Sequence, residues 1–182
     1  LRGIRGSDAL LSDGTPQVAF IGRSNVGKSS LLNALTEKKQ LARVGKKPGK
    51  TTEINIYKVN GTHYFLDLPG YGYADATPAE REKLRKLIIW YFTSGEGHPT
   101  LTVLALEAKA GLTRFDEEML KILRELQLPS VNVLNKVDKL SQKELAEKMR
   151  DIKQRTGELG ILQTSTETGR GISALRERIF AV

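Results

Sequence analysis

The chain has 182 residues and no cysteine, and its 29 Lys and Arg outnumber its 21 Asp and Glu to give a formal net charge of +8. The lack of cysteine excludes disulfides and thiolate metal sites, and no apolar run reaches the length of a membrane span or a signal-peptide core. We therefore expect a soluble, cytoplasmic monomer without a membrane partner, with an N-terminal arm over 1–14 and one domain over 15–182. The basic balance favours a polyanionic partner, and a basic surface that serves only solubility is the alternative.

A phosphate-binding motif follows the first predicted strand. Val18–Ile21 is a short apolar run typical of a buried strand, and the segment from Ser30 to Thr36 has the apolar spacing of a helix. Between them the sequence fits G-x-x-x-x-G-K-[ST], over Gly22, Arg23, Ser24, Asn25, Val26, Gly27, Lys28, Ser29 and Ser30. Lys28 is expected to reach the β- and γ-phosphates of a nucleotide, and the Ser29 hydroxyl to bind Mg²⁺. A tight glycine turn that binds nothing is the alternative.

A basic, glycine-containing segment from Glu37 to Lys50 is predicted to be a mobile loop. Its cationic residues are Lys38, Lys39, Arg43, Lys46, Lys47 and Lys50. Beside a nucleotide site, contact with an RNA backbone is as well supported as a solvated loop. A hairpin is predicted next, because Asn60-Gly61 separates the alternating run Ile54–Val59 from the run His63–Asp67.

The rest of the chain alternates helices with strands. Helices are predicted from Thr77 to about Phe92, from Thr113 to about Leu126, from Ser141 to about Thr156 and from Gly171 to Phe180, and strands over Leu101–Leu106, Val131–Leu134 and Ile161–Leu162. This order predicts an α/β fold with a six-stranded, mostly parallel sheet, one antiparallel hairpin strand and helices on both faces. Ligands of such sheets bind at the carboxyl ends of the strands.

The segment that ends the hairpin is a candidate magnesium and γ-phosphate site. It consists of Asp67, Leu68, Pro69 and Gly70. Asp67 is expected to hold Mg²⁺ opposite Ser29, and Gly70 to offer its N–H to a γ-phosphate. An ordinary strand-to-loop turn is the alternative. Thr51 is a candidate second hydroxyl ligand for Mg²⁺, but spacing alone leaves its neighbour Thr52 as a competing candidate.

The segment after Val131–Leu134 predicts guanine recognition. It consists of Asn135, Lys136, Val137 and Asp138. Asp138 can accept hydrogen bonds from the N1–H and exocyclic amine of guanine, Asn135 can face the O6/N7 edge, and the Lys136 stem can cover the ring. Adenine lacks the amine, so a site built for these groups would reject it. The alternative is a polar loop that caps the next helix.

Two further segments carry weaker signals. Thr164, Ser165 and Thr166 follow the last predicted strand, where their N–H groups and hydroxyls could support the same base. Tyr71 follows Gly70, where Ras-type GTPases place a glutamine that orients water. Tyr71 and Tyr73 are expected to be either partner contacts or loop anchors.

These motifs together resemble the bacterial EngB (YihA/YsxC) GTPases. The resemblance is carried by Val18 to Leu35, Lys47-Pro48-Gly49-Lys50-Thr51, Asp67-Leu68-Pro69-Gly70-Tyr71-Gly72-Tyr73-Ala74 and Asn135-Lys136-Val137-Asp138, and it extends over about Asp13 to Phe180. The sequence departs from the family at Thr166, where alanine or serine is common, and at Glu107, where aspartate is usual. The continuation Lys109-Ala110-Gly111 is also atypical.

The resemblance implies a Ras-like P-loop GTPase fold and a role in assembling the large ribosomal subunit, with an associated role in cell division and septation. It implies that Thr51 is the magnesium threonine and that Thr164, Ser165 and Thr166 form the last guanine-binding segment. It also places Gly49, Lys50, Thr51, Thr52 and Glu53 at the nucleotide. The expected metal ligands are then Ser29, Thr51 and Asp67, and the expected catalytic residues are Lys28, Thr51 and Gly70.

The predicted function is a GTP-hydrolysing switch with GTP or GDP and Mg²⁺ as ligands, and with the large ribosomal subunit or its precursor, rRNA included, as partner. Slow intrinsic turnover is expected, because Tyr71 has no side-chain amide to orient water. K⁺ is a candidate activator at Asn25, whose amide oxygen could ligate it; a hydrogen bond within the loop is the alternative. A nucleotide kinase and an RNA-binding module without turnover are the competing classes.

Overall fold

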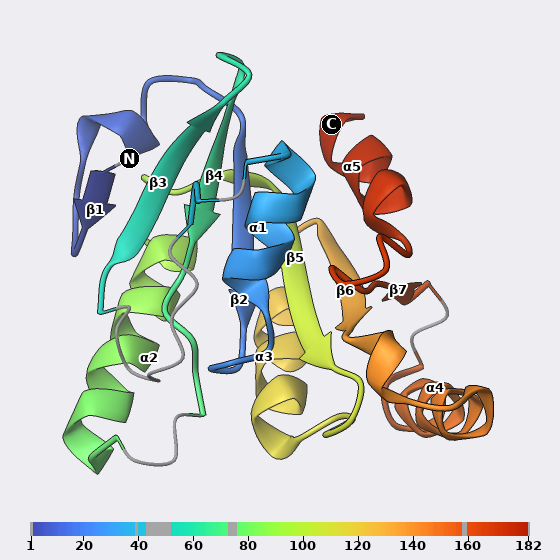
Figure 1. Ribbon diagram of the computed structural model, residues 1–182. Coiled ribbons are helices and arrows are strands. Elements are labelled where there is room, and N and C mark those ends of the chain that lie inside the picture. Colours follow the sequence, from blue (N-terminus) through green and yellow to red (C-terminus); the bar gives the residue numbers. More distant parts are fainter. Residues whose placement is uncertain (1, 39, 43–51, 73–75, 158–159, 182) are drawn as a thin grey trace.

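The computed structural model describes residues 2–38, 40–42, 52–72, 76–157 and 160–181. They form one seven-stranded sheet in the order β1-β3-β4-β2-β5-β6-β7 (Figure 1). The strands are β1 (Arg2–Ile4), β2 (Gln17–Gly22), β3 (Ile54–Val59), β4 (His63–Asp67), β5 (Pro99–Glu107), β6 (Ser130–Asn135) and β7 (Leu162–Gln163). The helices are α1 (Lys28–Thr36), α2 (Pro78–Thr93), α3 (Arg114–Glu125), α4 (Gln142–Thr156) and α5 (Ile172–Phe180), with 3-10 turns η1 (Ala9–Leu11) and η2 (Val137–Lys139).

The sheet confirms the predicted class, but the prediction of six strands was wrong. β4, β2, β5, β6 and β7 run parallel, and β3 pairs antiparallel with β4, as the hairpin signal predicted. The seventh strand is β1 in the N-terminal arm, which pairs antiparallel with β3. Its three residues include one buried side chain, Ile4, so they have no alternation that sequence reasoning could detect. The open edge of β3 supplies the pairing partner instead.

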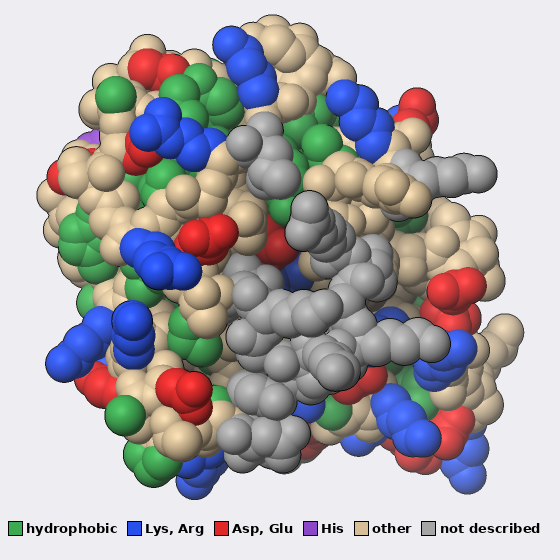
Figure 2. Space-filling model, turned by 60° about the vertical axis from the view of Figure 1, so that its left-hand side comes forward, with side chains coloured by type: hydrophobic (Ala, Val, Ile, Leu, Met, Phe, Trp, Pro, Cys, Tyr) green, Lys and Arg blue, Asp and Glu red, His purple; other side chains and the backbone are tan. Residues whose placement is uncertain are grey.

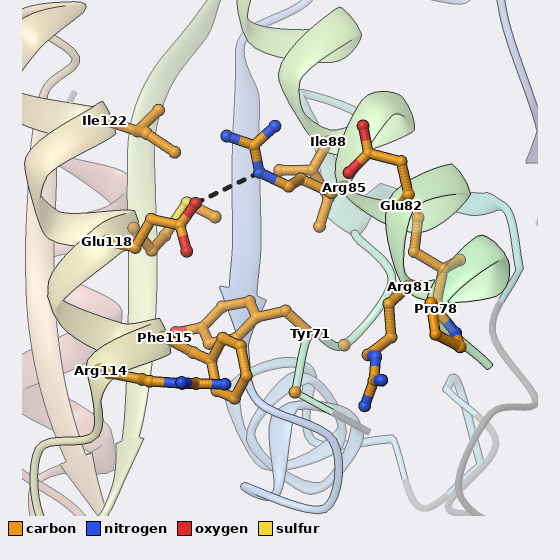
Figure 3. Close-up of a pocket in the computed structure, with 14 residues that line it drawn as sticks. Tyr71, Pro78, Arg81, Glu82, Arg85, Ile88, Arg114, Phe115, Glu118 and Ile122 are labelled. Atoms are coloured by element: carbon orange, nitrogen blue, oxygen red, sulfur yellow. Dashed lines mark hydrogen bonds and ion pairs between the residues drawn. The ribbon is translucent and has the colours of Figure 1, made fainter. Parts of the chain in front are cut away.

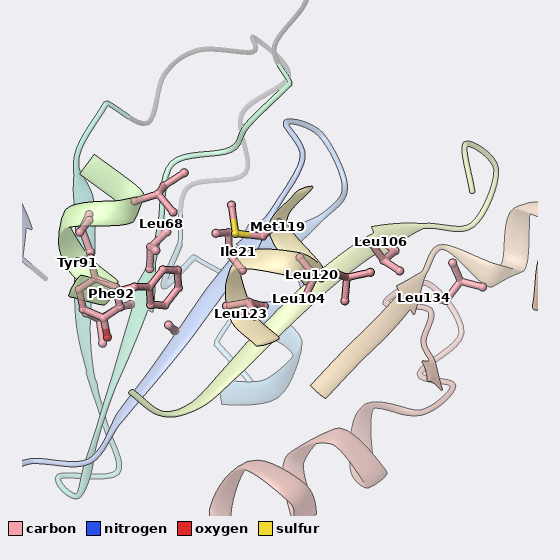
Figure 4. Packing of buried hydrophobic residues seen from close by; sticks show 14 of the residues in the cluster. Ile21, Leu68, Tyr91, Phe92, Leu104, Leu106, Met119, Leu120, Leu123 and Leu134 are labelled. Carbon is pink, nitrogen blue, oxygen red and sulfur yellow. The ribbon is translucent and has the colours of Figure 1, made fainter. Parts of the chain in front are cut away.

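The two faces of the sheet carry separate hydrophobic layers. Successive side chains of a strand point to opposite faces, so in β2 Ala19 and Ile21 belong to the layer that α2, α3 and α4 cover, whereas Val18 and Phe20 belong to the layer that α1 and α5 cover. Figure 4 shows the first layer, where Met119 of α3 lies over Ile21. Because helices cover both faces, the carboxyl ends of the parallel strands remain at one open edge of the sheet.

Local signals set the helix starts as predicted. In α2 and α4, the side chains of Thr77 and Ser141 accept hydrogen bonds from the N–H groups of Glu80 and Glu144, whose carboxylates accept in return. These capping boxes satisfy N–H groups that have no partner within the helix. Among the described residues, no helix combines the length and apolar character that a membrane span requires.

Charged side chains of both signs are intermixed among the described residues on the surface in view (Figure 2). Figure 2 shows Lys and Arg side chains on this face with Asp and Glu side chains between them. The cationic residues predicted to contact RNA over 43–50, and Lys39, lie outside the described residues. The predicted basic contact therefore stays a prediction.

A buried polar chain connects α2 to the start of β2. Tyr91 is fully buried, and its hydroxyl donates to Oε1 of Gln17 at 3.0 Å. The Gln17 amide in turn donates from Nε2 to the carbonyl of Leu11 at 2.7 Å. Burial raises the pKa of the Tyr91 phenol, so the hydroxyl remains a donor across the accessible pH range.

We predict that Tyr91→Phe lowers the free energy of unfolding by about 1–3 kcal/mol, because it leaves the Gln17 oxygen buried without a donor. Tyr64→Phe is the matched control. The Tyr64 hydroxyl donates to Oδ2 of Asp13 at 2.7 Å, but Asp13 is exposed and water can replace the lost bond. Urea denaturation of both variants measures the difference. Equal losses would show that the burial of Gln17 is unimportant.

Candidate functional site

The P-loop spans the turn from β2 into α1. Gly27 caps the helix with a φ of 98°, and the first helical hydrogen bond runs from the N–H of Leu31 to the carbonyl of Gly27. The N–H groups of the three residues between them, Lys28 to Ser30, thus lie in the first helical turn without helical partners. Such groups, together with the positive end of the helix dipole, favour an anion.

The two motif glycines are required by close packing. A Cβ atom on Gly22 would lie 2.5 Å from the carbonyl oxygen of Ala105 in β5. A Cβ on Gly27 would lie 2.5 Å from Nδ2 of Asn135. Real Cβ atoms do not approach other atoms this closely, so the P-loop reaches the ends of the neighbouring strands only with glycine at both positions.

Asn135 joins the P-loop to the two loops predicted to bind guanine. Its Nδ2 donates to the carbonyl of Val26 at 3.0 Å, and its Oδ1 accepts from the hydroxyl of Thr164 at 3.0 Å. The side chain is buried, with 1% of the residue exposed. The amide nitrogen has two hydrogens, and the bond to Val26 uses one of them. Only the second hydrogen is therefore left for the predicted contact with the O6/N7 edge of guanine.

Lys136 continues this connection from a left-handed backbone conformation with a φ of 61°. Its Nζ donates to the carbonyl of Asn25 at 2.6 Å and lies 3.1 Å from Oε1 of Glu107. Glu107 was noted in the sequence only as a departure from a family pattern. Its position opposite Asn135 in the β5–β6 register explains how it reaches Lys136. The sequence signal that could have predicted this contact is an acidic residue, Glu107, at the end of the strand next to β6.

Asp138 is held ready to accept hydrogen bonds. The hydroxyl of Ser165 donates to its Oδ1 at 2.6 Å, and Lys139 lies 3.5 Å from its Oδ2. The Ser165 bond is the largest influence that lowers the pKa of the Asp138 carboxyl below its usual range. Since Ser165 and Thr164 are fully buried while Thr166 is partly exposed, the first two members of the predicted segment are the ones built into the site.

The opposite end of the site holds two opposite charges, the buried carboxylate of Asp67 and the partly exposed ammonium of Lys28. Asp67 ends β4 with 4% exposure, and burial raises the pKa of its carboxyl, against the opposing effects of the Lys28 ammonium and a hydrogen bond from Ser29. Burial also lowers the pKa of Lys28, and Asp67 opposes that shift. The Oδ1 atom of Asp67 is buried without a hydrogen-bond partner. An unpaired carboxylate oxygen beside a serine hydroxyl fits the oxygen donors that Mg²⁺ prefers.

The segment after Asp67 folds back onto the P-loop. The N–H of Ser24 donates to the carbonyl of Tyr71 at 3.0 Å, and the N–H of Tyr71 donates to the carbonyl of Gly22 at 3.3 Å. Gly70 passes so close that a Cβ there would lie 3.0 Å from the Cα of Ser24. Leu68 is fully buried beneath this segment. The structure thus brings Gly70 beside the phosphate-binding loop, and its predicted contact with a γ-phosphate stays a prediction.

Tyr71 is a loop anchor. Its hydroxyl donates to Oδ1 of Asp116 in α3 at 2.8 Å, and burial, followed by the charge of Asp116, raises the pKa of the phenol well above its usual range. The Oδ2 atom of Asp116 accepts from both the N–H and the hydroxyl of Thr113. Sequence reasoning missed Asp116 as the partner of Tyr71, because no local pattern connects the two residues. Tyr73, the other tyrosine in that hypothesis, lies outside the described residues.

The threonine candidates are only partly covered. Gly49, Lys50 and Thr51 lie outside the described residues, so the choice between Thr51 and Thr52 stays open. Thr52 is exposed. Glu53, predicted to contact nucleotide, instead faces the arm: its Oε2 lies 3.6 Å from Nε of Arg5.

Comparisons with known proteins show which proteins the chain is similar to. Residues 17–136 match the family described as 50S ribosome-binding GTPase. A probable GTP-binding protein EngB of Thermosipho africanus is 43% identical over 164 residues, which cover 90% of this chain and 84% of that protein. A crystal structure of a probable GTP-binding protein EngB covers 91% of this chain and 97% of its own, with a TM-score of 0.76 at 29% identity. Era in complex with MgGDPNP and nucleotides 1506–1542 of 16S ribosomal RNA has a TM-score of 0.72 at 25% identity over 91% of this chain and 56% of Era.

We predict that Gly27→Ala weakens GDP binding by at least roughly tenfold, or about 1.4 kcal/mol, because the new Cβ displaces the Asn135 amide that joins the loops. Gly14→Ala is the matched control. Gly14 has a similar left-handed φ of 83°, but a Cβ there would meet nothing within 4 Å. Both variants carry backbone strain, and only one carries the clash. Titration with a fluorescent GDP analogue measures both affinities, and similar values would refute the proposed contact.

Proposed function

Because the chain belongs to the EngB family of GTP-binding proteins, we propose that it is a molecular switch that hydrolyses GTP to GDP and phosphate. The observation that supports this best is that the candidate site has two chemically different ends, which lie along one edge of the sheet. Asp138, bonded to Ser165, lies at one end, and the Lys28–Asp67 pair lies at the other. The amide of Asn135 connects them.

The first end suits guanine. An ionised Asp138 accepts from two neighbouring donors, and the N1–H and exocyclic amine of guanine are such a pair. The remaining amide hydrogen of Asn135 can be donated to the O6/N7 edge, and the Lys136 stem, fixed by Glu107 and by the carbonyl of Asn25, can cover the ring. A base without the two donors would leave Asp138 unpaired, which is the basis of discrimination.

The second end suits the phosphates. The first-turn N–H groups of α1 and the Lys28 ammonium supply positive charge where the β- and γ-phosphates are expected. Gly70 is placed by Ser24 beside the same loop, and its N–H is proposed to contact the γ-phosphate. Thr51 is proposed to act there as a further hydroxyl donor.

We propose Ser29, Asp67 and Thr51 as protein ligands of Mg²⁺. The unpartnered, buried Oδ1 of Asp67 and the Ser29 hydroxyl, which is close enough to lower the pKa of the same carboxyl, support the first two. When bound, Mg²⁺ neutralises negative charge on the β- and γ-phosphate oxygens during phosphoryl transfer. The protein's own part is to orient the phosphates through Lys28 and the P-loop N–H groups.

Intrinsic turnover is proposed to be slow. The Tyr71 hydroxyl is committed to Asp116, so the position after Gly70 offers no amide to an attacking water. A partner that orders the loops and a K⁺ ion at Asn25 are the proposed remedies. Asn25 is exposed at a φ of 64°, and none of the described residues shares a hydrogen bond with its side chain, so its amide oxygen is available.

The proposed partner is the large ribosomal subunit or its precursor. The family is described as 50S ribosome-binding, Era forms a complex with rRNA, and the net charge of +8 favours a polyanion. We propose that the chain works as a monomer in the cytoplasm, where ribosomes are assembled. A nucleotide kinase would need a site for a phosphate acceptor, and an RNA-binding module would not need to hydrolyse GTP. The phosphate-release assay below separates both classes from a GTPase.

For base recognition, Asp138→Asn should lose the preference for guanine and gain affinity for xanthine nucleotides, whose edge carries the complementary group. The wild type should bind GTP and GDP far more tightly than ATP. Competition titrations with GDP, XDP and ADP measure this. Asp151→Asn, which changes an exposed carboxylate of α4 in the same way, is the control. Unchanged GDP affinity in Asp138→Asn would remove Asp138 from the base site.

For turnover, phosphate release from GTP should be slow for the chain alone, faster with 50S subunits, and faster in KCl than in NaCl at equal ionic strength. Asn25→Ala should abolish the difference between the two salts. Asn60→Ala is the control, because it changes another exposed asparagine with positive φ, in the β3–β4 turn. This variant should retain the difference in rate between KCl and NaCl.

Other outcomes of this assay separate the hypotheses. GTP binding without phosphate release in any condition would indicate an RNA-binding module. Transfer of phosphate to a nucleoside monophosphate would indicate a kinase. Equal rates in both salts, with and without 50S subunits, would exclude K⁺ and leave the partner as the activator.

A further inference from the structure

A groove lies between α2 and α3, beyond the nucleotide edge of the sheet (Figure 3). Its volume is about 340 Å³. Gly70, Tyr71 and Gly72 close one end, so the groove shares a wall with the predicted phosphate site without containing the P-loop. None of the roles assigned above uses its remaining residues.

The floor of the groove is aliphatic. Ile88 and Met119 are buried beneath it, and Leu84 and Ile122 form its partly exposed sides. Across it, Nε of Arg85 donates to Oε1 of Glu118 at 3.2 Å, which joins the two helices above the floor. A groove with this lining favours an apolar side chain, because insertion removes apolar surface from water.

The charges of the rim are distributed unevenly. At the end where Arg85 pairs with Glu118, Figure 3 also places Glu82. At the Tyr71 end, Arg81 of α2 and Arg114 of α3 project from opposite sides. Both are exposed, and no carboxylate within the described part of the chain pairs with either one.

Arg114 is partly held in place. Its guanidinium carbon lies 4.8 Å from the centroid of the Phe115 ring, a cation–π contact that restricts the arginine and covers the ring. A guanidinium that is fixed but unpaired is well prepared for a carboxylate, because less side-chain entropy is lost on binding. The Tyr71 end therefore offers two cationic donors next to an apolar floor.

We propose that the α2–α3 groove is a docking site for a protein segment that inserts a large apolar side chain between the helices and places an Asp or Glu carboxylate between Arg81 and Arg114. The charge complementarity identifies the partner as an acidic, amphipathic segment of another protein. A second copy of this chain, with its net positive charge, is a poorer match.

Protein fits this groove better than RNA. Bases bind to protein chiefly by stacking on exposed aromatic rings, and here the ring of Phe115 is already covered by Arg114. The floor offers branched aliphatic and thioether groups, from which a ribose-phosphate backbone gains little. The proposal does not depend on GTP turnover, and its test needs none.

The test is selection of 12-residue peptides from a displayed random library on the wild-type chain, followed by affinity measurement with synthetic peptides. The groove variant is Arg81→Glu combined with Arg114→Glu. The control is Lys83→Glu combined with Lys121→Glu, which makes the same change of charge on the same two helices outside the groove. Thermal unfolding monitored by circular dichroism verifies that both variants fold.

Selected peptides should carry an acidic residue beside a large apolar one, bind the control like the wild type, and lose at least roughly tenfold in affinity on the groove variant. Replacing their acidic residue by Lys should restore binding to the groove variant, a rescue that a misfolded variant could not give. Ile122→Arg, which places a long charged side chain at the apolar side of the groove, should also abolish binding.

Three results would overturn the proposal. Peptides that bind the groove variant and the control equally would place the site elsewhere, and so would an absence of acidic, apolar peptides among those selected. If a 12-nucleotide oligouridylate bound the wild type and lost affinity only on the groove variant, the surface would be an RNA contact instead.

Discussion

The buried amide of Asn135 is the contact on which the candidate site depends. Its nitrogen donates to the P-loop at Val26 and its oxygen accepts from Thr164, so one side chain fixes the relative positions of three loops. Because the amide is almost fully buried, neither group can turn to water, and loss of either partner would leave a costly unsatisfied group. The close approach of Gly27 follows from the same contact. A loop drawn this near to Nδ2 has no room for a Cβ.

The carboxylates at the two ends of the site have pKa values shifted in opposite directions. Asp138 has a donor in Ser165, which lowers the pKa of its carboxyl and keeps it ionised. Asp67 is buried with one oxygen unpartnered, and the pKa of its carboxyl is raised. The first arrangement suits a neutral base that presents hydrogen-bond donors. The second leaves the buried charge of Asp67 incompletely compensated by Lys28, which is reasonable where a cation and phosphates are to complete the site.

The segment after Asp67 connects the phosphate end to the helices behind the sheet. Its backbone pairs with the P-loop at Ser24, and its Tyr71 hydroxyl is held by Asp116 at the start of α3. Tyr71 also forms part of the wall of the α2–α3 groove. A rearrangement of Gly70 would therefore act on the groove through its covalent neighbours and the hydrogen bond from Tyr71 to Asp116.

The sequence alone determined the local features of the structure, which depend on residues close together in the chain. The P-loop lies between an apolar run and a helical one, Asn60-Gly61 specifies a two-residue hairpin turn, and Thr77 and Ser141 begin helices with their own partners three residues on. From these, the α/β class and the edge that carries the motifs could be predicted. Tertiary structure alone decided the seventh strand, the pairing of Glu107 with Lys136, the two bonds of Asn135 and the anchoring of Tyr71. Asn135 and Val26 are 109 positions apart, and Tyr71 and Asp116 are 45 apart. No local propensity encodes such contacts, because they arise only when the sheet brings the ends of separate strands together.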